Sequence, residues 1–406
     1  MNKKRKKGTT KKSEKKGKKN TLSIIILILL PILLAPMFFG YEMFDSKFMT
    51  QTAYFIQGNP VEYDIGRGGP QELTSPIAVR MFVPLLSVPL APLFGMEIAF
   101  AIVGVLFWIL GGLATYYFFR KFFEDEKLGL YTAIMFAISM PSIVWGPMVA
   151  TDMGGYFFLI FGILIIEKYA REYTYKSYSI MGVVLALAIL TRDHLLLLLI
   201  YLGLTVLFDK GIRIKEYIGD IPKFLIAILI ALLPYWLWKK AFNIISGSNW
   251  LMSYITQSLG PGGISTFIFR TALTFHYLWV IFFISIVKLY KKLSKYKKEF
   301  IIKNSLSIIP YVLFSYIIAN YSPRYAFALF PLVLPFATYQ MHLWSMSLQK
   351  KTKINYRYFM LGFIILYGVI SIIGASMYPR ENRVNDVGTV LSSIFGEDSW
   401  LAKLGV

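Results

Sequence analysis

Residues 185–202 read LALAILTRDHLLLLLIYL, so three adjacent ionisable residues, Arg192, Asp193 and His194, interrupt a long apolar stretch. A charge at the centre of a bilayer costs roughly 2.5 to 3.5 kcal/mol even on the mildest scale, and it therefore needs a reason. As one helix, residues 178–208 would extend about 46 Å at 1.5 Å per residue, whereas a hydrocarbon core is roughly 30 Å thick. Basic residues flank residues 178–208 on both sides. We predict a hairpin with arms of about 21 Å each and a charged tip recessed below the membrane surface.

The composition extends this prediction to the whole chain. Its 406 residues are 56% hydrophobic, 17% aromatic and only 16% charged, and a soluble domain of this composition would expose apolar surface that it could not cover. Apolar blocks recur between short polar joints, without the alternation of a membrane β-barrel. The predicted fold is all-α and polytopic, with about eleven transmembrane helices near 21–39, 96–118, 129–147, 154–166, 178–191, 195–208, 222–238, 267–287, 300–319, 325–344 and 358–377.

The net charge of +21 is concentrated in part in the first residues of the chain. Residues 1–19 hold eleven Lys or Arg and one Glu, which favours a disordered basic tail over residues 1–20 that contacts anionic lipid. An RNA or ribosome contact is the alternative, and no nucleic-acid partner is expected for the rest. The chain has no cysteine, which excludes disulfides and thiolate chemistry. A transmembrane domain over 21–377 and a short outer tail over 378–406 complete the predicted organisation.

Basic joints alternate along the chain as the positive-inside rule requires. With the N-terminal tail in the cytoplasm, the joints that fall inside contain Arg120, Lys121, Lys127, Lys168, Arg171, Lys176, Lys210, Arg213, Lys215, Lys288, Lys291, Lys292, Lys295, Lys297, Lys298, Lys350, Lys351, Lys353 and Arg357. The opposite, non-cytoplasmic face then receives Asp45, Asp152, Arg192, Asp193, His194 and Arg324. We therefore expect an integral, multi-pass membrane protein with its charged site on the non-cytoplasmic face.

The first outer segment, residues 40–95, is too long for a simple connector. Phe44, Phe48, Phe55 and Ile56 recur at helical spacing, opposite Lys47, Gln51 and Tyr54, which predicts an amphipathic helix at the membrane interface. The later VRMFVPLLSVPLAPLFG contains three prolines, which disfavour an ordinary spanning helix. A second interfacial or re-entrant element is predicted there.

Each charged residue of the outer face also has a structural interpretation. Asp45 and Asp152 could cap the helices that follow them, and Arg324 could extend from a span end to the lipid headgroups. Asp193 and His194 could form a polar turn. Together, however, carboxylates and guanidinium groups in one recessed pocket suit a reaction in which a hydroxyl loses a proton and a phosphate leaves.

The order of these segments resembles a known superfamily. FDSKFMTQTAYFIQGNP, RMFVPLLSVPLAPLFG, WGPMVATDMGGYF, LALAILTRDHLLLL and SPRYAFALFPLVLP follow one another as in the polytopic GT-C glycosyltransferases, which include the protein O-mannosyltransferases and the lipid A aminoarabinose transferase. The resemblance covers roughly residues 20–345, and its individual motifs are short and degenerate.

The resemblance implies transfer of a sugar, with inversion, from a polyprenyl-phosphate donor to a glycan, lipid or protein acceptor. Asp45 matches the catalytic position in the first outer loop, and Asp152 matches a second acidic position assigned to acceptor or metal. Arg324, Arg192 and Arg270 are the candidates for binding donor phosphate. Many relatives have paired acids at this position, whereas this chain has Asp45 followed by Ser46. This difference weakens the case for a bound divalent metal, and the resemblance implies no other cofactor.

Two other functions remain open from the sequence. A transporter or flippase for a lipid-linked or anionic solute would also use recessed charges, but the chain shows no convincing internal repeat, and its charges lie toward one face. A non-catalytic assembly factor that retains the fold is the third alternative.

Overall fold

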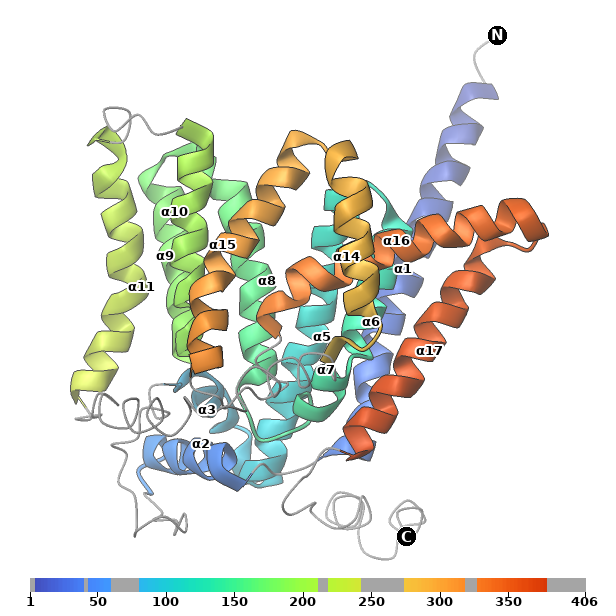
Figure 1. The fold of residues 1–406 in the computed structure, drawn as a ribbon. Coiled ribbons are helices and arrows are strands. Elements are labelled where there is room, and N and C mark those ends of the chain that lie inside the picture. The colour runs from blue at the N-terminus through green and yellow to red at the C-terminus, as the bar shows by residue number, and fades with distance from the viewer. Residues whose placement is uncertain are drawn as a thin grey trace, which may run out of the picture.

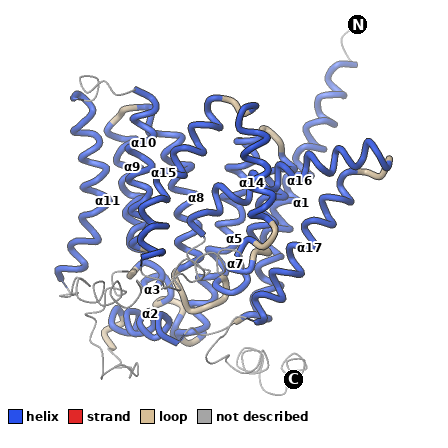
Figure 2. The backbone as a smooth tube through the Cα atoms, viewed as in Figure 1, coloured by secondary structure: helices blue, strands red, loops and turns tan. Residues whose placement is uncertain are grey.

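The computed structural model describes residues 4–39, 43–59, 80–210, 218–241, 274–317 and 327–377. Within these ranges every regular element is a helix (Figure 2), which confirms the predicted all-α fold. The α-helices are α1 (Lys4–Phe38), α2 (Met43–Ile56), α3 (Phe82–Ser87), α4 (Ala91–Phe94), α5 (Met96–Phe123), α6 (Glu126–Ala137), α7 (Met140–Trp145), α8 (Asp152–Tyr169), α9 (Tyr175–Thr191), α10 (Leu197–Lys210), α11 (Ile221–Ala241), α14 (Leu278–Leu289), α15 (Lys295–Ile317), α16 (Phe330–Thr352) and α17 (Tyr356–Met377).

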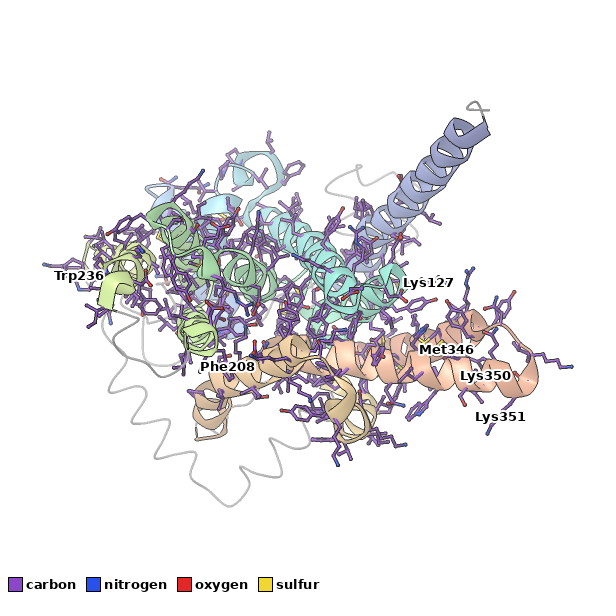
Figure 3. The ribbon with its side chains drawn as sticks, turned by 90° about the horizontal axis from the view of Figure 1, so that it is seen from above. Lys127, Phe208, Trp236, Met346, Lys350 and Lys351 are labelled. Atoms are coloured by element: carbon purple, nitrogen blue, oxygen red, sulfur yellow. The ribbon has the colours of Figure 1, made fainter. Side chains whose placement is uncertain are left out.

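Five helical stretches among the described residues are long and apolar enough to cross a membrane. They are Thr21–Phe38, Met96–Phe123, Asp152–Glu172, Ile218–Ala241 and Tyr356–Ser376, and Tyr175–Thr191 and Leu278–Lys288 are shorter apolar helices. The predicted number of eleven spans is not confirmed by these lengths. The outward-facing sides of these helices expose large apolar side chains. Trp236 of α11, for example, is 52% exposed and projects from the edge of the bundle (Figure 3).

The predicted hairpin is present. Helix α9 ends at Thr191, a 3-10 turn covers Asp193–Leu196, and α10 begins at Leu197. The α9–α10 tip lies toward the same end of the bundle as α2, whereas the N terminus and the basic connection between α14 and α15 lie toward the other end (Figure 1). The hairpin tip and the basic connection between α14 and α15 therefore lie at opposite ends of the bundle.

Two stretches differ from the sequence prediction. The span expected over 129–147 is divided into α6 and α7, because Ser139 caps a new helix by accepting a hydrogen bond from the Ser142 backbone N–H, and Pro141 occupies its first turn. Helix α1 continues back to Lys4 through the basic tail, which was expected to lack order. Lysine has a high helix propensity, so a helix that begins in the apolar block can extend into the tail.

The centre of the bundle is formed by α5, α6 and α8 around Tyr156. The Tyr156 ring stacks on Phe136 with centroids 4.0 Å apart, and its hydroxyl lies 2.9 Å from the Thr115 hydroxyl oxygen. Hydroxyl pairs of this kind satisfy polar groups between helices in a membrane. This core fixes the direction of α8, and hence the position of its first residue, Asp152.

A polar network joins α8, α10 and α15 farther along the bundle. The Lys303 ammonium donates to a Glu167 carboxylate oxygen, and the Tyr201 hydroxyl donates to the same oxygen at 2.6 Å. Lys303 is fully buried and the Glu167 side chain is 8% exposed. Because an ion pair in this setting must be well hydrogen-bonded to be tolerated, the network fixes the register of the three helices.

The first outer segment forms α2, α3 and α4. Helix α2 lies across the lower ends of the upright helices in Figure 1, as the amphipathic pattern predicts. Gln51, which the pattern places on the polar face, is only 5% exposed because α3 and α5 cover α2. The proline-rich stretch is two short helices, α3 and α4, joined by a turn, which confirms that it is no ordinary span.

Candidate functional site

Arg192 and Asp152, two of the predicted site residues, form a buried ion pair. The chain leaves the helical conformation at Arg192, whose φ of −151° and ψ of 123° are extended. Its side chain turns toward α8, where Nη1 donates to Oδ1 of Asp152, and both side chains are only 2% exposed. Arg192 is therefore buried inside the protein at the tip of the hairpin.

A pair of glycines in α8 makes room for Arg192. An added Cβ at Gly155 would lie 2.7 Å from Cδ of Arg192, and one at Gly154 would lie 2.9 Å from Cγ2 of Thr191. Both distances are shorter than real Cβ contacts allow. The sequence Asp152–Met153–Gly154–Gly155 thus supplies both the counter-charge and the space for the arginine.

Two donors of the Arg192 guanidinium remain unsatisfied. Nε and Nη2 are buried and have no hydrogen-bond partner among the described residues. These two atoms form the edge of the guanidinium that binds carboxylate or phosphate through two parallel hydrogen bonds. An unpaired buried donor costs roughly 1 to 3 kcal/mol, and more when it is charged, so this edge is suited to an anion or an ordered water.

Helix α2 begins beside the same segment. The Ser46 hydroxyl donates to the Val149 carbonyl at 2.7 Å, and Val149 precedes Asp152 by three residues. Asp45, the neighbour of Ser46, belongs to the first turn of α2, and its side chain lies outside what the structure describes. The backbone of the predicted catalytic position is therefore adjacent to the loop that leads into Asp152.

A second ion pair connects the first outer segment to the hairpin tip. Arg80, which precedes α3, approaches Oδ1 of Asp193 with Nη2 at 3.0 Å and Nε at 3.2 Å. Partial burial opposes ionisation of Asp193, whose side chain is 42% exposed, but the charges of Arg80, His194 and Arg192 outweigh this effect and lower the pKa of the carboxyl. Asp193 therefore connects the hairpin tip to the segment before α3 through its ion pair with Arg80, a contact that the polar-turn interpretation did not include.

Two predicted phosphate ligands, Arg270 and Arg324, lie outside the described residues. After Arg324, the described part of the chain resumes at Phe327. The centroid of the Phe327 ring lies 5.6 Å from that of the Tyr156 ring. Tyr156 is one turn along α8 from Asp152. The start of the α16 segment therefore packs beside the helix that carries the buried ion pair.

Sequence reasoning did not identify Arg80, Ser46, Gly154 or Gly155. The glycine pair directly after Asp152 was the available signal, because adjacent glycines in an apolar helix permit close approach of another segment. In the described part of the chain, no group of three or more His, Asp or Glu side chains is arranged to hold a metal ion.

Comparisons with known proteins agree with this architecture. A family model described as dolichyl-phosphate-mannose-protein mannosyltransferase matches residues 89–238. The oligosaccharyltransferase of Archaeoglobus fulgidus, crystallised with a tethered acceptor peptide, superposes with a TM-score of 0.54 at 12% identity, over 89% of this chain and 56% of that one. ArnT from Cupriavidus metallidurans, in its apo state, gives a TM-score of 0.51 at 12% identity, over 93% and 78% of the two chains. None of the curated proteins compared with the chain matches it.

The chain therefore has the fold of the GT-C superfamily of membrane glycosyltransferases, as the resemblance in the sequence implied. It spans little more than half of the archaeal oligosaccharyltransferase. At 12% identity these similarities concern the fold, and the long apolar helices indicate an integral membrane protein.

Proposed function

We propose that the protein transfers a sugar from a polyprenyl-phosphate donor to an acceptor hydroxyl at the end of the bundle where α2 lies. The observation that carries the proposal is the unsatisfied Nε–Nη2 edge of Arg192, held by Asp152 beside the start of α2. This end is the non-cytoplasmic face if the basic tail is cytoplasmic.

In the proposed reaction, the acceptor oxygen attacks the anomeric carbon from the side opposite the phosphate. The bond between this carbon and the phosphate oxygen breaks, its electrons remain on the phosphate, and the configuration inverts. Asp45 accepts the proton of the attacking hydroxyl as general base. No metal is required for this balance of protons and charge.

Arg192 stabilises the charge that develops on the leaving phosphate. Its Nη1 is already used by Asp152, so two parallel bonds from Nε and Nη2 remain for the phosphate oxygens. Asp152, matched by resemblance to an acceptor or second acidic position, acts here as a positioning residue for Arg192. Arg324 and Arg270 are proposed as further phosphate ligands, on the basis of the sequence alone.

The test uses the full-length protein in lipid nanodiscs with radiolabelled polyprenyl-phosphate sugars and membrane extract of the host. We expect label to move to an extract component with the wild type, and Asp45→Asn to abolish this transfer. Asp220→Asn, at the other end of the bundle beside Lys223, is the matched control and should retain it. Transfer at the wild-type rate by Asp45→Asn would refute the assignment of the base, and movement of intact donor between leaflets without transfer would favour the flippase alternative.

A further inference from the structure

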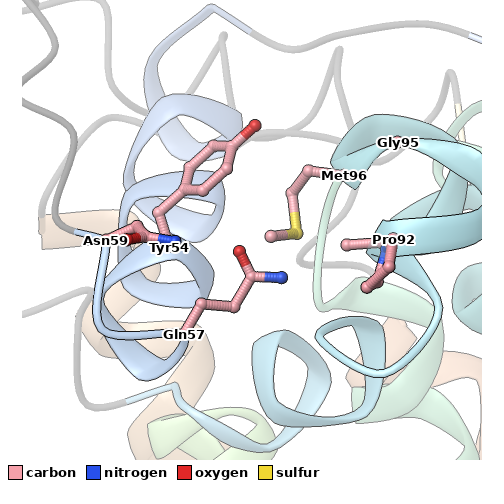
Figure 4. Close-up of a pocket in the computed structure, with 7 residues that line it drawn as sticks. Tyr54, Gln57, Asn59, Pro92, Gly95 and Met96 are labelled. Atoms are coloured by element: carbon pink, nitrogen blue, oxygen red, sulfur yellow. The ribbon is translucent and has the colours of Figure 1, made fainter.

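A pocket of about 490 Å³ lies between the far end of α2 and the start of α5. Tyr54, Gln57 and Asn59 line one wall, and they face Pro92, Gly95 and Met96 across the open space (Figure 4). Its volume is within the roughly 300 to 1,000 Å³ of ligand pockets. None of the functions assigned above uses this pocket.

Two glycines with positive φ shape the pocket. Gly58 has φ of +80° and follows Gln57 at the end of α2, where the Asn59 backbone N–H donates to the Tyr54 carbonyl at 2.9 Å. Gly95 has φ of +79° and forms the opposite rim. An added Cβ at either glycine would meet nothing within 4 Å, so backbone conformation, not lack of space, calls for glycine there. The turns hold the Gln57 and Asn59 side chains at the mouth of the pocket.

The lining has the chemistry of a neutral, hydroxyl-rich ligand. Its described lining residues combine one aromatic ring, the apolar surfaces of Pro92 and Met96, and two amides, and none of these described residues is Lys, Arg, Asp or Glu. Each amide can donate and accept hydrogen bonds at once, as neighbouring sugar hydroxyls do, while the aromatic and apolar groups match the C–H face of a sugar ring. A phosphate would lack a cationic partner among these residues.

The distance to the reaction centre determines which part of a substrate fits. Tyr54 follows Asp45 by nine residues of one helix, which is about 14 Å along its axis. A ring in the pocket is therefore separate from the ring whose hydroxyl would react at Asp45. Building on the function proposed above, we infer that the pocket binds an uncharged, non-reacting sugar ring of the acceptor, so that the acceptor is a glycan of several units.

Binding can be tested without catalysis by saturation-transfer NMR in lipid nanodiscs, because alkyl-glycoside detergents would compete for the pocket. The probes are uncharged methyl glycosides of one to three hexose or N-acetylhexosamine rings. We expect a signal from at least one probe with wild type, with Asp45→Asn and with the control Tyr358→Ala, whose tyrosine is 69% exposed on α17. Loss of the amide hydrogen bond in Gln57→Ala should weaken binding about two- to tenfold, and loss of the ring in Tyr54→Ala about tenfold.

A second measurement separates the pocket from the reaction. In the transfer assay, Tyr54→Ala should raise KM for acceptors of three rings with little change in kcat, and should leave single-ring acceptors unaffected. Absence of binding by every probe, or binding as strong as that of the wild type by both Tyr54→Ala and Gln57→Ala, would overturn the inference. Binding without any transfer from polyprenyl-phosphate sugars would instead refute the proposed function and leave sugar binding by the pocket standing.

Discussion

The Asp152–Arg192 pair predicts a large and strongly coupled loss of stability. Both side chains are 2% exposed, so replacing either one leaves a charge buried without its partner. Removal of one partner from such a pair costs about 3 to 5 kcal/mol. Asp152→Asn keeps one acceptor oxygen for Nη1 and should fall near the lower value, which corresponds to a shift of roughly 100-fold in the unfolding equilibrium.

A double-mutant cycle measures the coupling. We would titrate the purified protein with SDS in mixed micelles and follow the fluorescence of its eight tryptophans. Arg192→Gln should cost about as much as Asp152→Asn, and the double variant should recover at least about 2 kcal/mol relative to the sum of the two. Arg357→Gln, an exposed arginine on α17, is the control and should change stability by less than about 0.5 kcal/mol. Losses that add within about 0.5 kcal/mol would show that the two side chains act independently and would refute the positioning role of Asp152.

Three further predictions follow from neighbouring contacts. Gly155→Ala should destabilise the protein by about 1 to 3 kcal/mol because its Cβ meets Arg192, whereas Gly362→Ala, with nothing within 4 Å, should stabilise it by up to about 1 kcal/mol in the same titration. Lys303→Met should cost about 3 to 5 kcal/mol because its buried carboxylate partner loses its cation; unchanged stability would contradict the network described above. The lowered pKa of Asp193 means that its ionised form is favoured in the folded state, so its contribution is complete above the unfolded pKa of about 3.9 and is lost as pH falls through the folded value. The difference in melting temperature between wild type and Asp193→Asn should therefore be smaller at about pH 3 than at about pH 5, and a difference of equal size at these two values would contradict the prediction.

Much of the architecture could be predicted from charge and length. The hairpin follows because residues 178–208 are too long for one span and have basic residues at both ends, and the structure places Arg192 at its buried tip. The break between α6 and α7 also had a signal, since Ser139 followed two residues later by Pro141 is a helix-start pattern. The apolar content of the stretch obscured it, because hydrophobicity alone does not distinguish one span from two short helices.

The sequence alone could not predict which distant side chains contact each other. Asp152 and Arg192 are forty residues apart, and their contact depends on how α8 and α9 approach each other at Gly154 and Gly155. Burial of Gln51 likewise depends on α3 and α5 covering α2. The roles of Asp45, Arg270 and Arg324 stay predictions, since the Asp45 side chain and both arginines lie outside the described residues.

The Glu167–Lys303 pair also constrains how the protein is made. Helix α15 carries Lys295, Lys297, Lys298 and Lys303 and is not among the stretches apolar enough to cross a membrane alone. Its buried lysine is neutralised by a carboxylate on α8, which is synthesised more than a hundred residues earlier. The buried position of Lys303 therefore depends on a carboxylate that is already present when α15 is made, which favours packing of α15 against α8 and α10 after those helices have formed.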